Sequence, residues 1–143
     1  MRRTVLFVIP VLLLCMAAAA QQPQPMPKLV VDAQYVYVTS YDGPSWSSKV
    51  LQEDKRAVGE VITALQKWGR YTVVFNPERA DIIIAVQRRP GSDTLAVYQG
   101  KLPGPKSTPL WREEKAGGLD SKEELPMLTR FQKAVEAGAA QKR

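Results

Sequence analysis

The chain has 143 residues, a net charge of +6 at pH 7, no histidine and a single cysteine, Cys15. Cys15 lies in an N-terminal leader, so the rest of the chain has neither a thiol nor an imidazole. This composition excludes catalytic sets that pair serine or cysteine with histidine, and it excludes zinc sites built from imidazole or thiolate ligands. We therefore expect no metal and no cofactor.

Residues 1–20 have the three parts of a secretory signal: a basic start, an apolar core and four closing alanines. The apolar run is shorter than the roughly 20 residues that cross a bilayer as a helix, so we predict cleavage after Ala20 and no transmembrane segment afterwards. A bulky leucine precedes Cys15, whereas lipoprotein signals have a small residue there, and we expect no lipid anchor. The predicted location is the periplasm or the medium.

Two of the basic residues belong to the leader, so the net charge of the remaining chain is +4. The positive charge is spread along the sequence and is densest at Lys55-Arg56 and Arg88-Arg89. Nucleic-acid binders usually concentrate basic side chains in one stripe, and we expect no nucleic-acid partner. Most of this charge is interpreted as solvated surface that keeps the protein soluble.

After the leader, residues 21–28 are rich in proline and glutamine, which predicts an extended tether without a core of its own. Residues 29–39 alternate between two faces and contain many valines and tyrosines, which predicts the first strand, in a central position. A single domain is expected over 29–137. The last residues, 138–143, are expected to fray.

The clearest element is a helix over residues 50–68, where apolar side chains recur every three or four positions. Gly69 follows at the position where a left-handed residue commonly ends a helix. At the other end, Ser47 or Ser48 can cap the first turn.

Further strands are predicted at 71–75, 82–86 and 94–99, with a short edge strand at 110–112. The first two are joined by a short polar connection, which favours antiparallel pairing between them. A closing helix is predicted from about residue 125. This order predicts a two-layer α/β sandwich, with a mixed sheet of four or five strands and two helices on one face.

The catalytic options that remain use carboxylates, tyrosine, or a lysine with a serine. Asp81 stands between a turn and a buried strand, and we interpret it as a strand-entry residue that hydrogen-bonds local backbone rather than a catalytic acid. A small hydrolase stays open as an alternative, and it requires a recess with at least two convergent acids. The acidic candidates are Asp32, Asp42, Asp81, Glu113, Glu114 and Asp120.

Aromatic and basic side chains offer a possible interaction surface. A module that binds cell-wall glycan or a polyanion is a second alternative, and it requires the three arginines and the tryptophan of this set to share one face. The candidate residues are Trp46, Tyr41, Arg56, Arg88 and Arg89.

A pattern of about fifty residues resembles a known group of domains. It comprises Tyr35-Val36-Tyr37-Val38, the phrase Leu65-Gln66-Lys67-Trp68-Gly69-Arg70-Tyr71 and then Ala80-Asp81 before Ile82. This resembles the small envelope domains at the amino terminus of TolB and in CsgG-like and LpoB-like bacterial lipoproteins. Members of that group are not enzymes and act through protein contacts in the envelope.

The resemblance implies a non-enzymatic, exported accessory domain that binds another protein of the bacterial cell envelope. The shared residues form a helix end and two strand starts, so they carry a fold and no reactive group. The hydrolase and the glycan or polyanion binder remain the alternatives.

Overall fold

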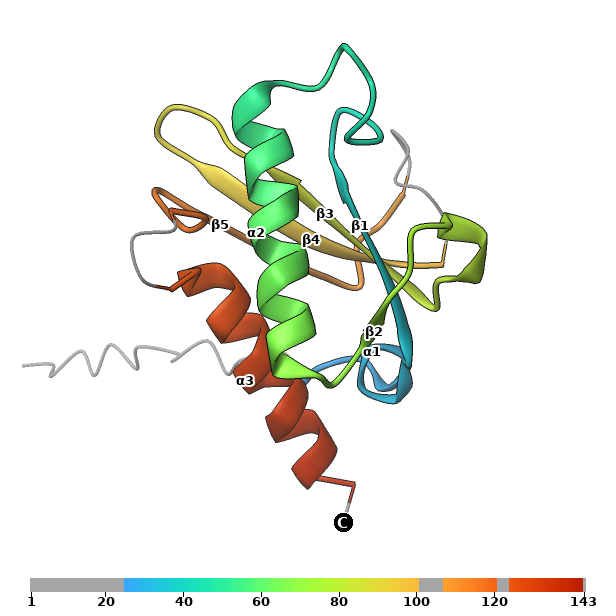
Figure 1. Cartoon of the computed structure of the whole chain (residues 1–143). Coiled ribbons are helices and arrows are strands. Elements are labelled where there is room, and N and C mark those ends of the chain that lie inside the picture. The colour runs from blue at the N-terminus through green and yellow to red at the C-terminus, as the bar shows by residue number, and fades with distance from the viewer. Residues whose placement is uncertain (1–24, 101–106, 121–123, 143) are drawn as a thin grey trace, which may run out of the picture.

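The computed structural model describes residues 25–100, 107–120 and 124–142 (Figure 1). The predicted leader and Cys15 lie outside the described residues. In chain order the elements are α1 (Lys28–Asp32), β1 (Tyr35–Ser40), α2 (Gln52–Trp68), β2 (Thr72–Val73), the short 3-10 helix η1 (Pro77–Arg79), β3 (Ile82–Gln87), β4 (Asp93–Gln99), β5 (Trp111–Lys115) and α3 (Pro126–Ala140).

The five strands form one mixed sheet in the order β2-β1-β3-β4-β5. β1 pairs in parallel with both β2 and β3, while β3 with β4 and β4 with β5 pair antiparallel. The helices α2 and α3 lie side by side over the same face of the sheet (Figure 1). The predicted two-layer α/β sandwich is confirmed. Among the described helices, none is long and apolar enough to span a bilayer.

The best-predicted element, the helix over 50–68, is confirmed as α2. Gly69 ends it in the left-handed region at φ 72°, and the Gly69 N–H donates to the Leu65 carbonyl. The predicted serine cap is wrong, because Leu51 precedes the first turn and no side chain caps it. The Ser47 hydroxyl instead accepts from the Lys49 N–H, in a turn that ends before the helix begins.

The predicted first strand is too long at its start, because residues 28–32 form the helix α1 instead. The Pro27 carbonyl accepts hydrogen bonds from the N–H groups of Val30 and Val31, which closes the helical turn. Both valine side chains are buried in the core. Burial of two neighbouring valines therefore decides the local structure here, although valine itself favours strands over helices.

The expected antiparallel pairing of the second and third strands is wrong. β2 is only two residues long and flanks β1 on one side, while β3 flanks it on the other. The connection between them spans β1: the Val74 N–H donates to the Val36 carbonyl and the Asp81 N–H donates to the Tyr35 carbonyl. The short polar connection therefore crosses a strand rather than closing a hairpin.

The remaining strands and the closing helix are confirmed, with β5 extending to Lys115 beyond the short edge strand predicted. The expected fraying from Gly138 is wrong, since α3 continues to Ala140. A Cβ on Gly138 would lie 2.9 Å from Val31 Cγ2 and 3.2 Å from Met26 Cβ, so the absent side chain lets α3 pack closely. Met26 is buried in that contact, so the chain joins the core within the predicted tether.

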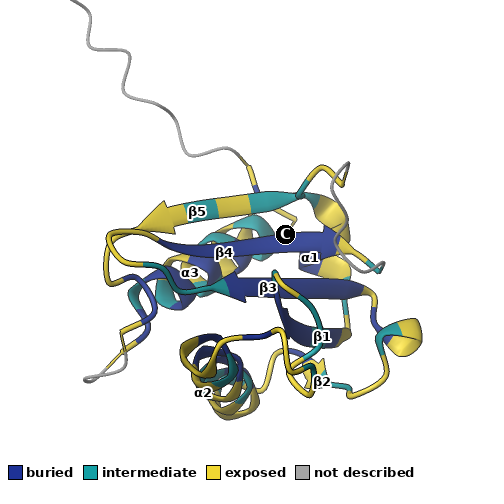
Figure 2. Cartoon of the chain, turned by 90° about the horizontal axis from the view of Figure 1, so that it is seen from above, coloured by how far each residue is buried: buried dark blue, intermediate teal, exposed yellow. Residues whose placement is uncertain are grey.

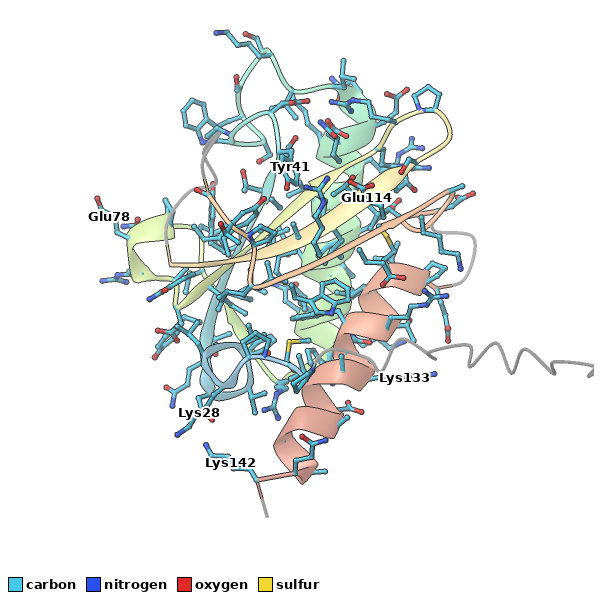
Figure 3. The ribbon with its side chains drawn as sticks, turned by 180° about the vertical axis from the view of Figure 1, so that it is seen from behind. Lys28, Tyr41, Glu78, Glu114, Lys133 and Lys142 are labelled. Atoms are coloured by element: carbon cyan, nitrogen blue, oxygen red, sulfur yellow. The ribbon has the colours of Figure 1, made fainter. Side chains whose placement is uncertain are left out.

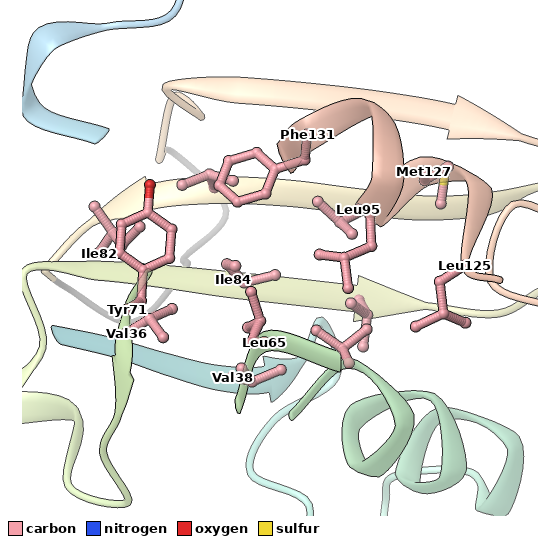
Figure 4. Close-up of a cluster of buried hydrophobic side chains, with 14 of the residues drawn as sticks. Val36, Val38, Leu65, Tyr71, Ile82, Ile84, Leu95, Leu125, Met127 and Phe131 are labelled. Carbon is pink, nitrogen blue, oxygen red and sulfur yellow. The ribbon is translucent and has the colours of Figure 1, made fainter. Parts of the chain in front are cut away.

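The main core lies between the helical layer and the facing side of the sheet, and Figure 4 shows its side chains. β3 and β4 are buried along most of their length, whereas β5 is largely exposed (Figure 2). Phe131 of α3 is fully buried at the centre of an aromatic group, with ring centroids 6.4 Å from Trp68, 6.4 Å from Tyr71 and 5.4 Å from Trp111. This group joins α3 to α2, β2 and β5.

Replacing Phe131→Ala is expected to lower the free energy of unfolding by about 3–5 kcal/mol, because it empties the centre of the aromatic group. The matched control is Phe75→Ala, since Phe75 is 77% exposed and its removal should change stability by less than about 0.5 kcal/mol. Urea denaturation followed by far-UV circular dichroism measures both. Equal losses in the two variants would contradict the packing described.

Candidate functional site

A buried carboxylate, Asp54, joins three segments at one end of the sheet. It lies in the first turn of α2 and is fully buried. Its Oδ1 accepts from the Arg88 N–H at 2.7 Å, and its Oδ2 accepts from Arg89 Nη1 at 3.1 Å and from the Ser40 hydroxyl at 3.4 Å. The end of β1, the start of α2 and the residues after β3 therefore meet at one charged group. In open α/β sheets this edge, beyond the carboxyl ends of parallel strands, commonly holds ligands.

The guanidinium of Arg89 binds two carboxylates and a carbonyl in this cluster. Besides Asp54, it forms an ion pair with Asp42 and donates to the Arg88 carbonyl. Burial opposes the charge of Arg89, but the hydrogen bonds to Asp54 and Asp42 outweigh it and raise its pKa. Arg89 is therefore the structural counter-ion of Asp54 and Asp42.

A second buried carboxylate, Asp93, lies at the start of β4 with 3% of its surface exposed. Its Oδ2 accepts from the Leu119 N–H at 2.9 Å, and its Oδ1 lies 3.9 Å from Arg88 Nε. Beside it is a recess of about 410 Å³. The recess is lined by Glu53, Arg56, Arg88, Arg89, Pro90 and Asp93.

The charges around this recess balance one another. Three arginines line the recess together with the carboxylates of Glu53 and Asp93, and two further carboxylates, Asp42 and Asp54, pair with Arg89. A polyanion site needs a local excess of positive charge, and this cluster has none. Its arrangement is that of an internal ion-pair network.

The five residues of the predicted interaction surface fall into separate places. Arg56, Arg88 and Arg89 meet at the recess. Tyr41 lies on the face of the sheet away from α2 and α3, where its ring packs edge to face with Tyr98 at 6.2 Å (Figure 3). Trp46 follows β1 in a loop, is 82% exposed and does not line the recess. Tyr41 and Trp46 are therefore not part of the recess that brings the three arginines together.

The sequence analysis did not identify Asp54 and Asp93 as buried acids, although the position of Asp54 in the sequence indicates its burial. The buried positions Val58, Val61 and Leu65 form one stripe of α2, and a step of four residues back from Val58 leads to Asp54. A carboxylate that continues an apolar stripe indicates a buried ion pair. Asp81 is a backbone partner, as interpreted, but not of local backbone: its Oδ2 accepts from the N–H groups of Gln34 and Tyr35, both at 2.9 Å, at the start of the neighbouring strand.

The tyrosines are poorly suited to act as bases. Burial raises the pKa of Tyr71 to about 12, and its hydroxyl donates to the Val30 carbonyl at 2.7 Å. Burial and the hydrogen bond with Tyr41 also raise the pKa of Tyr98. Within the described residues, no group of three His, Cys, Asp or Glu side chains is placed to hold a metal ion.

A second recess, of about 500 Å³, lies between α2 and α3. We call it the α2–α3 groove. Its apolar lining comes from Ala64 and Trp68 of α2 and from Leu125 and Leu128 at the start of α3. Trp68 links the two helices, because its Nε1 donates to Glu136 Oε1 at 3.0 Å and its ring packs against Phe131. The two helices therefore contact each other at Trp68. The groove lies between them on the side of Trp68 toward the start of α3.

The charged lining of the groove is mainly acidic. Glu60 of α2 and Glu124 before α3 are negative, and Lys67 is the basic residue of the lining. The Oε2 oxygen of Glu60 is buried and accepts no hydrogen bond from any group within the described parts of the chain. Sequence reasoning missed this groove, because it is formed by residues far apart in the chain.

Comparison with known proteins finds no matching family model, no similar curated protein and no similar solved structure. The function of the chain is therefore argued from its own geometry, with the resemblance to envelope domains as an expectation.

Removing the carboxylate in Asp54→Ala is expected to lower the free energy of unfolding by about 3–5 kcal/mol, because Arg89 and the Arg88 N–H lose a buried partner. Asp42→Ala is the matched control, since it removes the other, partly exposed partner of Arg89 and should cost less than about 1 kcal/mol. Chemical denaturation measures both values. Similar losses would show that the buried carboxylate has no special role.

The raised pKa of Tyr71 predicts a loss of stability at high pH. As the pH rises through about 10, the unfolded state releases the phenolic proton first, so the free energy of unfolding falls until about pH 12. Tyr71→Phe should make this fall shallower, because it removes the buried phenol. Urea denaturation between pH 9 and 11 provides the test. A wild-type slope in Tyr71→Phe would contradict it.

Proposed function

We propose that the protein is a non-enzymatic module that binds another protein of the bacterial cell envelope, with the α2–α3 groove as the contact surface. The observation that carries this proposal is the apolar lining of that groove, formed by Ala64, Trp68, Leu125 and Leu128. Apolar side chains inside a polar rim are the anatomy of protein interfaces.

The identity of the lining residues favours a protein ligand. Tryptophan is among the residues that contribute most to binding at interfaces, and Trp68 is held in place by Glu136 and Phe131. A side chain fixed before binding loses little conformational entropy when a partner docks. The groove also follows two helices, a shape that suits a segment of polypeptide.

The hydrolase alternative finds little support in the geometry. The buried acids Asp54 and Asp93 are held by arginines and backbone N–H groups. Burial raises the pKa of both Tyr71 and Tyr98, so each phenol holds its proton more firmly than a free tyrosine. A general base needs a free lone pair near neutral pH, and these groups do not offer one.

The glycan or polyanion alternative is also weakly supported. Arg56, Arg88 and Arg89 share a recess, but carboxylates balance their charge and Trp46 is not part of it. The envelope location rests on the secretory leader and on the resemblance to envelope domains. The predicted leader supports export, and the resemblance supports protein contact.

Site-specific photocrosslinking in the native cells tests the proposal. A benzophenone amino acid at Thr63, which lines the groove, should form an adduct with a defined envelope protein. The matched control position is Gln66, which is exposed on the same helix and lines neither recess. Adding Ala64→Arg, which fills the groove, should abolish the Thr63 adduct.

Two results would contradict the proposed function. One is the absence of an adduct from Thr63, or equal adducts from Thr63 and Gln66. The other is turnover of an ester or glycoside panel by the purified chain at a rate that Ala64→Arg leaves unchanged.

A further inference from the structure

One carboxylate oxygen of Glu60 lacks a hydrogen-bond donor in the free protein. Glu60 lies on α2 and lines the α2–α3 groove, and its Oε2 is buried without a hydrogen-bond donor in the described ranges. A buried charged oxygen without a donor is costly, because it loses its water and gains no replacement. The groove therefore contains an acceptor that a bound group would satisfy.

The other donors along this face of α2 are used elsewhere. The Thr63 hydroxyl donates to the Gly59 carbonyl at 3.0 Å, and Trp68 Nε1 donates to Glu136. Arg56 lies one turn before Glu60 and Lys67 two turns after it, and neither forms an ion pair with it among the described residues. In the free protein, none of these side chains supplies the missing donor.

The surroundings of Glu60 favour a cationic donor over a neutral one. Glu124 adds a second negative charge to the lining, and Lys67 alone opposes them. Apolar groups from Ala64, Leu125 and Leu128 lower the local dielectric, which strengthens a charged hydrogen bond to the carboxylate. Lysine and arginine make such bonds, and these are about twice as strong as neutral ones.

We infer that the α2–α3 groove binds a basic, amphipathic segment of a partner protein, in which a lysine or arginine pairs with Glu60 while an apolar side chain packs against Ala64 and Trp68. This inference rests on the proposed function and specifies the chemistry of the partner. An acidic segment would place like charges beside Glu60 and Glu124, and a purely apolar one would leave the buried Oε2 without a donor.

A phage-displayed library of random 12-residue peptides is the probe. The library is selected on the purified protein and depleted on the Ala64→Arg variant, so that only groove-dependent peptides remain. These peptides are expected to share at least one Lys or Arg next to an apolar residue. Chemically synthesised copies are then measured by isothermal titration calorimetry.

Glu60→Gln should weaken the binding of such a peptide at least ten-fold, because the charge-assisted bond is lost. Replacing the basic residue of the peptide by norleucine should weaken binding to the wild type similarly, with little further loss in Glu60→Gln. The matched control is Glu53→Gln, because Glu53 is an exposed acid on the same helix and lines the other recess. This variant should bind the peptide with the affinity of the wild type. Thermal unfolding checks that Glu60→Gln is folded.

The outcomes separate the two claims. If no groove-dependent peptide is recovered, the docking surface of the proposed function is wrong. If such peptides are recovered but are acidic or neutral, or bind Glu60→Gln as tightly as the wild type, the groove is a docking surface and only the inferred pairing with Glu60 is wrong.

Discussion

The buried carboxylate of Asp54 fixes the relation between α2 and the sheet. It accepts hydrogen bonds from the end of β1 and from the residues after β3, and it neutralises Arg89. At the other end of α2, Trp68 is tied to α3 through Glu136 and Phe131. The helix is therefore held at both ends, and the wall that it gives to the α2–α3 groove is set before any partner arrives. A preformed wall reduces the entropic cost of binding.

The sheet is used differently on its two faces. One face forms the main core with α2 and α3, and the other carries Tyr41 and Tyr98 around the small residues Ala85 and Ala96 (Figure 3). In the described parts of the chain the charged groups with buried atoms are paired, apart from Glu60. This pairing engages the buried acids Asp54 and Asp93 in structural contacts, so the proposed function relies on shape and apolar area instead.

The layers of this fold could be predicted from the sequence, but the way in which its sites form could not. The helix over 50–68 and the strand over 82–86 follow from periodicity, because each buries a continuous apolar stripe or run. The parallel pairing of β2 with β1 depends on where residues 74–81 cross the sheet, and local pattern carries no information on that path. The α2–α3 groove likewise joins Trp68 to residues some sixty positions away, so no local motif marks it.

Chemical-shift mapping on the whole molecule tests the central claim most directly. The 15N-labelled protein is mixed with a detergent-solubilised envelope extract from its native cells, and backbone amide shifts are followed. Shifts or line broadening are predicted along the groove, around Thr63, Ala64, Leu128 and Gln132, which lie on both of its walls. Changes confined to the opposite face of the sheet around Tyr98, or no change at all, would contradict recognition through this groove.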